Sequence, residues 1–274
     1  MRGSLRVSAS FGPYETGELT YTADLLPSVP DNSLSLFDRG FVAANLLIPL
    51  TQQGNNRHFL VRGKKNLRWQ LIKRFGPNDL LVEMKVSASA RKENPSLPTT
   101  WTVRLITYQR PGYRPQTLLT SLQDPIGYPA NEIADLYHER WELELGYDEI
   151  KTEILDREES IRSKSPDAVT QELWGILIAY NLVRLEMERI AKQANVEPTR
   201  ISFVAALRLI ADEWLWCAIA SPGAIPKHLR NLEAALIGLI LPARRPHRRY
   251  PRAVKIKMSS YERKRRSAMG TGLK

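Results

Sequence analysis

The chain has 274 residues, 43% of them apolar, which is long enough to bury a real core as one large domain or as a domain with appendages. One cysteine excludes a disulfide framework, four scattered histidines make a zinc site a poor fit, and no apolar run suits a signal peptide or a membrane span. The formal net charge of +11 agrees with a nucleic-acid-binding protein.

The first 63 residues predict alternating strands and helices, as in an α/β domain. Residues 5–11 alternate like a strand, and residues 33–37 form a second alternating stretch. Residues 41–50 have the composition of a helix, and residues 58–62 predict another strand. We therefore expect a partial α/β core over residues 1–63.

Asp38 follows the predicted strand 33–37 directly and precedes Gly40. A carboxylate just past the carboxyl end of a strand is where open α/β sheets place functional groups. The more common use of aspartate before glycine is to cap a helix or to form a turn. Asp38 is therefore a candidate site residue with a structural alternative.

Residues 64–128 are rich in predicted strands, at 67–73, 80–86, 101–108 and around 115–122, separated by glycine and proline. Arginines and tyrosines in this region could touch a nucleic acid, although decoration of exposed strands explains them better; they are Arg104, Arg110, Arg114, Tyr108 and Tyr113.

Residues 129–156 predict one long amphipathic helix with an unusual chemical strip. At roughly 100° per residue, Arg140, Glu144 and Lys151 lie at about 300°, 340° and 320° from Tyr137. A phenol, a guanidinium, a carboxylate and an ammonium thus share one side of some four turns. Ordinary charge pairing on a solvated helix is the alternative explanation. Asp148 projects near the strip and is assigned to the surface.

The C-terminal half predicts helices followed by a basic tail. A helix begins after Ser165 and continues to about residue 194, and two more follow at 199–218 and 227–240. Residues 242–266 contain eleven basic residues and one acidic residue, a net charge of +10. Such a tail either binds nucleic-acid phosphates or acts as a solubilising segment. The candidate DNA-binding residues of the tail, 242–274, are Arg244, Arg245, Arg248, Arg249 and Arg252.

The spacing Tyr137-x2-Arg140-x3-Glu144-x6-Lys151 resembles the YREK signature of DDE transposases of bacterial insertion sequences, of the insertion-sequence-4 type. The Asp-Arg-Gly-Phe element at 38–41 resembles the segment that carries their second catalytic aspartate. Further similar stretches lie at 11–20, 161–184 and 248–265. The resemblance covers nearly the whole chain.

The resemblance implies an RNase H-like catalytic core, a β-rich insertion at 64–128 and a helical completion of the core at 129–241. It implies cut-and-paste DNA transposition with two Mg²⁺ ions held by three acidic groups, of which Asp38 and Glu144 match two. Arg140 and Lys151 would contact DNA phosphates and Tyr137 would position the strand. It also implies transposon-end and target DNA as partners, a homodimer in a synaptic complex, and a bacterial cytoplasmic, nucleoid-associated location without a membrane.

The third carboxylate of the family has no counterpart in this sequence. The family's first aspartate lies on the first strand of the sheet, whereas residues 5–11 contain no acidic residue, and Asp24 and Asp31 fall in a helix-like stretch and a turn. We therefore expect a transposase that lacks its first strands and is inactive alone. The alternatives are a catalytically dead remnant that only binds DNA, and one half of a split transposase.

Overall fold

The computed structural model describes residues 5–13, 15–110, 114–155 and 161–242, of which those up to 240 form one compact unit. Its strands and helices follow one another along the chain as α1 (Glu18–Leu25), β1 (Ser33–Phe37), α2 (Ala44–Gln52), β2 (Arg57–Arg62), β3 (Gln70–Gly76), β4 (Asp79–Lys85), α3 (Ala88–Glu93), β5 (Thr100–Tyr108), β6 (Gln116–Thr120), α4 (Ala130–His138), α5 (Trp141–Glu149), α6 (Pro166–Gln193), α7 (Phe203–Ile219) and α8 (Ile225–Ile237). Short 3-10 turns lie at 26–28, 39–41, 198–200 and 222–224.

One six-stranded mixed sheet has the order β1-β2-β6-β5-β4-β3. β1 and β2 are parallel, and Phe37 pairs with Val61, so both strands end at the same edge of the sheet. All other neighbours are antiparallel. The sheet runs without interruption from β2 into the strand-rich region 64–128, because β2 pairs with β6. An α/β fold with a sheet and helices is thus confirmed.

The two faces of the sheet are buried against different helices. Alternating strand residues separate into two apolar clusters, since neighbouring side chains on a strand point to opposite faces. One cluster contains Leu47 of α2 with Phe59 and Leu105, and the other contains Tyr137 of α4 with Leu60. Coverage of both faces leaves few solvent-facing positions in β2, β5 and β6.

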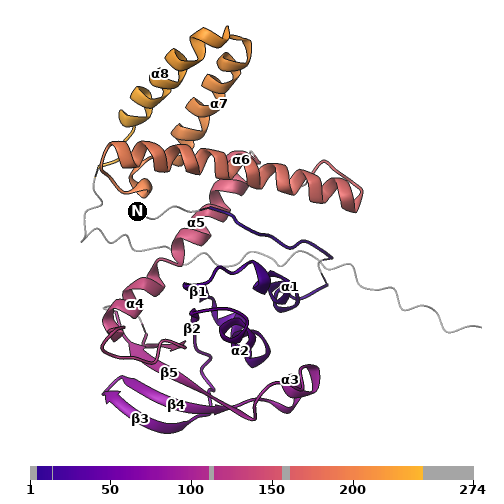
Figure 1. Ribbon diagram of the computed structural model, residues 1–274, viewed down its shortest axis with the longest axis vertical. Helices are drawn as coiled ribbons and strands as arrows, with labels where there is room; N and C mark the ends of the chain where they lie inside the picture. Colours follow the sequence, from indigo (N-terminus) through magenta and orange to yellow (C-terminus); the bar gives the residue numbers. More distant parts are fainter. Residues whose placement is uncertain (1–4, 14, 111–113, 156–160, 243–274) are drawn as a thin grey trace, which may run out of the picture. The chain divides into compact units, whose positions relative to one another are not determined.

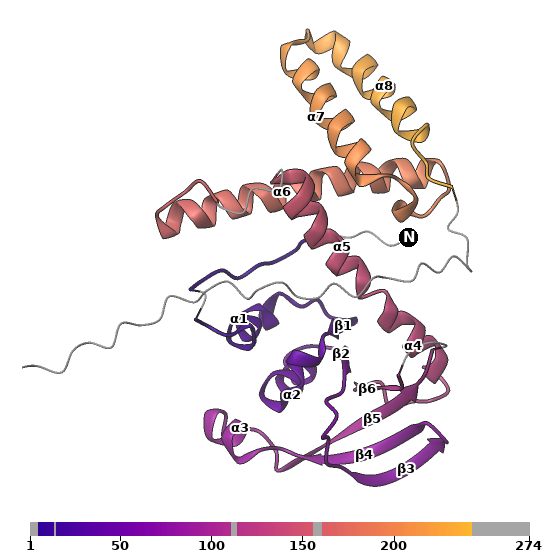
Figure 2. The same cartoon turned by 180° about the vertical axis from the view of Figure 1, so that it is seen from behind.

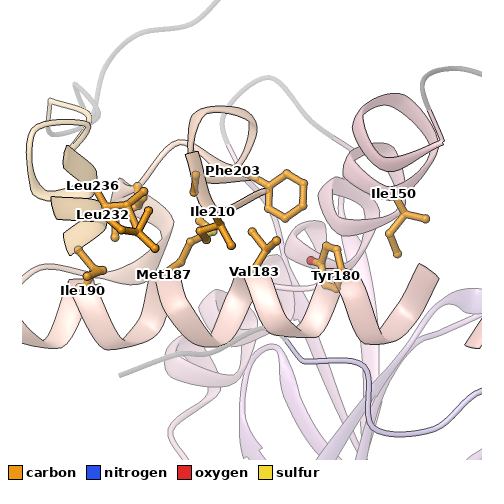
Figure 3. Packing of buried hydrophobic residues seen from close by; sticks show 12 residues of the cluster. Ile150, Tyr180, Val183, Met187, Ile190, Phe203, Ile210, Leu232 and Leu236 are labelled. Carbon is orange, nitrogen blue, oxygen red and sulfur yellow. The ribbon is translucent and has the colours of Figure 1, made fainter. Parts of the chain in front are cut away.

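Helices α6, α7 and α8 enclose a separate core (Figure 3). Tyr180, Val183, Met187 and Ile190 follow one another along α6 and meet side chains of α7 and α8. The predicted start of α6 is confirmed, because the Ser165 hydroxyl accepts a hydrogen bond from the backbone N–H of Ala168. None of the described helices is both long and apolar enough to cross a bilayer.

The predicted strand at residues 5–11 is wrong. This segment is extended but belongs to no sheet. Its backbone is satisfied instead by one side chain of α6: the N–H of Arg6 donates to Asn181 Oδ1, and Asn181 Nδ2 donates to the Arg6 carbonyl, both at 2.7 Å. An amide side chain thereby replaces a neighbouring strand, which an alternating sequence pattern cannot distinguish.

The single helix expected over 129–156 is also wrong in detail. α4 tightens at its end, because the N–H groups of Glu139 and Arg140 bond to carbonyls three residues earlier, and α5 begins at Trp141. A π-helical turn, Ile150–Ile154, follows α5. α4 packs against β5, whereas the π turn packs against α6. We attribute the changes in pitch to these two separate anchors, and a uniform 100° per residue therefore does not hold from Tyr137 to Lys151.

Candidate active site

The site lies at the carboxyl end of β1, where Asp38 leaves the sheet. The Asp38 side chain is exposed, and its Oδ1 accepts a hydrogen bond of 2.7 Å from the N–H of Arg39. This bond caps the short 3-10 turn at 39–41, so the structural alternative for Asp38 is realised. One carboxylate oxygen performs the capping, which leaves the second oxygen as an acceptor for a ligand.

Tyr137 joins α4 to this strand end. Its side chain is buried, with 5% exposed, and its hydroxyl donates to the carbonyl of Phe37 at 3.0 Å. Burial raises the pKa of Tyr137, and the negative charge of Asp38 raises it further, while Arg140 and Arg62 act in the opposite direction. Tyr137 is therefore a neutral hydrogen-bond donor that fixes the signature segment beside Asp38.

Arg140 and Glu144 form the charged part of the site. Arg140 Nη1 lies 2.8 Å from Glu144 Oε1, and the guanidinium lies 5.9 Å from the centre of the Tyr137 ring. Burial alone would lower the pKa of Arg140, but the hydrogen bond to Glu144 and the charge of Asp38 raise it above its usual value. Arg140 thus pairs directly with Glu144, whereas Asp38 acts on the guanidinium through its charge.

Arg62 is a site residue that the sequence analysis missed. It ends β2 and follows Val61, the partner of Phe37, so it emerges at the same sheet edge as Asp38. Its charge lowers the pKa of Tyr137, although burial outweighs this effect. The parallel pairing of β1 with β2 could have indicated it, because Asp38 follows the last residue of β1 and Arg62 is the last residue of β2.

The remaining candidates are not placed with this group. Lys151 is exposed in the π turn, seven residues beyond Glu144, which is roughly 10 Å along a helix axis. Asp148 is exposed, in agreement with its assignment to the surface. The tail candidates lie outside the described residues; they are Arg244, Arg245, Arg248, Arg249 and Arg252.

The two carboxylates suit a hard divalent cation only as part of a site. Among the residues that the structure describes, no group of three or more His, Cys, Asp or Glu side chains could hold a metal ion. Asp38 and Glu144 nevertheless provide the oxygen donors that Mg²⁺ prefers, and Mg²⁺ commonly takes few carboxylates and completes its shell with water and phosphate oxygens. If Glu144 coordinated Mg²⁺, the metal ion would replace Arg140 as the cationic partner of its carboxylate.

Replacing Tyr137 by phenylalanine tests the link between α4 and β1. We expect the free energy of unfolding to fall by about 1 kcal/mol, because the partly buried carbonyl of Phe37 loses the Tyr137 hydroxyl as a donor while the ring packing stays. Urea denaturation measures the change. Tyr128→Phe, at a ring that is 42% exposed, is the matched control, and an equal loss in both variants would contradict the assigned bond.

A mixed sheet whose parallel strands end next to Asp38 and at Arg62, together with the Arg140–Glu144 pair that follows α4, defines an α/β protein with charged side chains gathered after the carboxyl ends of these strands. A family model described as the transposase DDE domain matches residues 2–182. The chain therefore belongs to the DDE transposases, and specifically to the insertion-sequence-4 type, as the first relative below shows.

That relative, Transposase InsG for insertion sequence element IS4 of Escherichia coli (strain K12), is 38% identical over 252 residues, which are 92% of this chain and 57% of InsG. A putative transposase for insertion sequence element IS4SA of Synechocystis sp. is 25% identical over 60% of this chain and 44% of its own length. The chain thus spans about half the length of the curated relatives it matches. A piggyBac transposase synaptic complex with hairpin DNA, solved by cryo-EM, aligns with a TM-score of 0.39 and 14% identity over 85% of this chain and 47% of that one.

Proposed function

We propose that this chain takes part in metal-dependent DNA strand cleavage and transfer, the reactions of cut-and-paste transposition of an insertion sequence. The observation that supports this most is the meeting of Asp38, Tyr137, Arg140 and Glu144 at one end of the sheet. Asp38 and the signature residues lie about 100 positions apart in the sequence, so their meeting is a property of the fold. RNase H-like topology of the core and the division at residues 63, 128 and 241 belong to the same proposal.

Asp38 and Glu144 are proposed to hold Mg²⁺, the metal that the family typically uses. A bound metal pair would activate the attacking oxygen and stabilise the leaving oxygen at the scissile phosphate. Capping by Arg39 N–H orients Asp38, and the Arg140 guanidinium orients Glu144. Each carboxylate is thus held by a donor of the chain itself, Asp38 by the Arg39 backbone and Glu144 by the Arg140 side chain.

Arg140 is proposed to contact a DNA phosphate beside the cut. Its Nε is buried and has no hydrogen-bond partner, so the guanidinium has donor capacity beyond its bond to Glu144. Tyr137 positions the strand indirectly, since its hydroxyl is used to hold α4 to Phe37. Lys151 and the arginines of the tail would contact phosphates further from the site.

A second candidate function is DNA binding without cleavage, either as a remnant or as one half of a split transposase. The number of carboxylates at the site favours this candidate. Asp38 and Glu144 both act on Arg140, but the described part of the chain contains no group of three metal-ligating side chains. In the split case, a separate polypeptide would supply the third carboxylate.

Cleavage of the DNA that carries the gene for this chain separates the two candidates. An end-labelled duplex containing the gene and its flanks would be incubated with Mg²⁺ and the chain, with and without the part of InsG that this chain does not match. We expect Mg²⁺-dependent strand breaks at the element's ends in the mixture, and Ca²⁺ in place of Mg²⁺ serves as the control. Cleavage by the chain alone supports the first candidate, cleavage only in the mixture supports the split transposase, and binding without cleavage in both reactions supports the remnant. A chain that binds no DNA rejects both candidates.

A further inference from the structure

A long segment next to the candidate active site contains positive charge only. From Arg39 to Asn78 the chain has eight arginines and lysines and no aspartate or glutamate. A run of 40 residues without an acidic group is unusual in a chain with 29 of them. One of the eight, Arg57, is neutralised by Asp31 at 2.9 Å, which lies outside the segment.

The second half of this segment leads away from the site. It begins at Arg62, at the end of β2, and Lys64 Nζ then lies 3.2 Å from the carbonyl of Val42, in the loop that follows Asp38. Leu67 packs on the apolar core of the sheet and fixes the course of the connection. Gly63 allows the close approach, since a Cβ there would meet side-chain atoms of Leu119 and Leu67 within 3.0 Å.

The segment then forms β3, the outer strand of the sheet (Figures 1 and 2). Residues 70–74 of β3 are all exposed, and two register irregularities interrupt the pairing of β3 with β4. Trp69, Leu71 and Ile72 are 43%, 49% and 51% exposed. We call five side chains along this path the basic ribbon: Lys64, Lys65, Arg68, Lys73 and Arg74.

Protection of a free sheet edge against aggregation is the ordinary explanation for such charges. Two observations favour a ligand instead. None of the basic ribbon side chains takes part in an ion pair among the described residues, and Lys73 Nζ lies instead 5.6 Å from the centre of the Phe75 ring. The charges also flank exposed Trp69, Leu71 and Ile72, whereas a protective edge would avoid exposed apolar groups.

We propose that the basic ribbon binds the phosphate backbone of duplex DNA that extends from the candidate active site along the outer edge of the sheet. The chain runs from Arg62, at the end of β2, to Arg74 on β3, which is the edge of the sheet opposite β1, and the positive charge along this segment complements a polyanion. Trp69 lies within the path, where its indole can pack against the sugar or base edges. This inference rests on the proposed function in DNA cleavage and transfer. It assigns DNA binding to a surface that contains none of the signature residues Tyr137, Arg140, Glu144 and Lys151.

Measuring duplex affinity at several salt concentrations tests the ribbon. A 30-base-pair duplex of arbitrary sequence would be titrated in fluorescence anisotropy with the full chain and with a quadruple variant that keeps Lys64, namely Lys65→Ala, Arg68→Ala, Lys73→Ala and Arg74→Ala. We expect binding at least about tenfold weaker at low salt and a slope of log K against log [salt] smaller by about 3 to 4, because each lost phosphate contact removes about 0.9.

A matched control removes the same charge from exposed positions on α3 and α8, with Arg91→Ala, Lys92→Ala, Lys227→Ala and Arg230→Ala. The proposal is overturned when the two quadruple variants bind alike, or when the ribbon variant changes only the oligomeric state in sedimentation, as a protective edge predicts. If the wild-type chain binds the duplex and the ribbon variant binds it equally well, the basic ribbon is not the DNA-binding surface, but the proposed function still stands. A wild-type chain that binds no duplex would reject both.

Site-specific cross-linking gives a second test that does not depend on the stability of a variant. A photoreactive amino acid in place of Trp69 is expected to cross-link to duplex DNA, whereas the same group in place of Ile126, which is 88% exposed, is not. Equal yields at the two positions would overturn the assignment.

Discussion

Replacing Arg104 by alanine is expected to lower the free energy of unfolding by about 3–5 kcal/mol, as for other broken buried ion pairs. Arg104 is fully buried, and its Nε and Nη2 donate to the two oxygens of Asp79 at 2.7 and 2.6 Å. Nη1 donates to the carbonyls of Leu122, Asp124 and Tyr128. Alanine would leave a carboxylate and three carbonyls without their donor. Urea denaturation followed by circular dichroism measures the loss.

Arg110→Ala is the matched control, because its ion pair with Asp135 at 2.6 Å joins side chains that are 42% and 74% exposed. A surface pair of this kind contributes about 0–1 kcal/mol. Arg104→Lys keeps the charge but not the planar fork, and we expect it to recover only a minor part of the stability. An Arg104→Ala chain as stable as the Arg110→Ala chain would contradict the assigned role.

Arg104 also shows where sequence patterns fail. The interpretation of Arg104 as DNA-contacting or as decoration of an exposed strand is wrong, because both faces of β5 are covered. Arg104 lies on the same side of β5 as Ile106, which packs in the cluster of α4. In a strand with alternating polar and apolar residues, an arginine is predicted to be exposed unless the acceptors that would pair with it in the core are known. Asp79 and the loop at 122–128 are distant in sequence, so nothing local indicated them.

Local patterns predicted more of the fold than of the site. The strands at 58–62, 80–86 and 101–108 and the helix after Ser165 follow from alternation, turn residues and capping, which are short-range effects. The strip on the signature helix depended on uniform pitch over 15 residues. The tightened turn at Arg140 and the π turn at Lys151 break that uniform pitch, so Arg140 pairs with Glu144 beside the Tyr137 ring, and Lys151 lies in the π turn seven residues beyond Glu144. Arg62 became evident only from strand pairing.

Replacing Glu144 by glutamine is expected to reduce Mg²⁺-dependent strand cleavage by about 10³-fold or more, whether cleavage is seen with the chain alone or in the mixture with the missing part of InsG. Loss of an anionic metal ligand removes several kcal/mol of transition-state stabilisation. Glutamine keeps the size of the side chain and can still accept a hydrogen bond from Arg140. The loss therefore reports the charge of residue 144 rather than the packing of α5.

The same variant makes an opposite prediction for DNA binding, which distinguishes a metal ligand from a residue that only holds the helix together. Arg140 loses its ionic partner at 2.8 Å, so its guanidinium becomes more available to a phosphate. We expect duplex affinity to be unchanged or higher in Ca²⁺, and the salt slope to rise by up to about one contact. Asp148→Asn removes an exposed carboxylate from the same helix and is expected to keep cleavage within about threefold of wild type. A Glu144→Gln chain that cleaves as well as the Asp148→Asn chain would show that residue 144 is not a ligand, and the site would then need another acidic residue in its place.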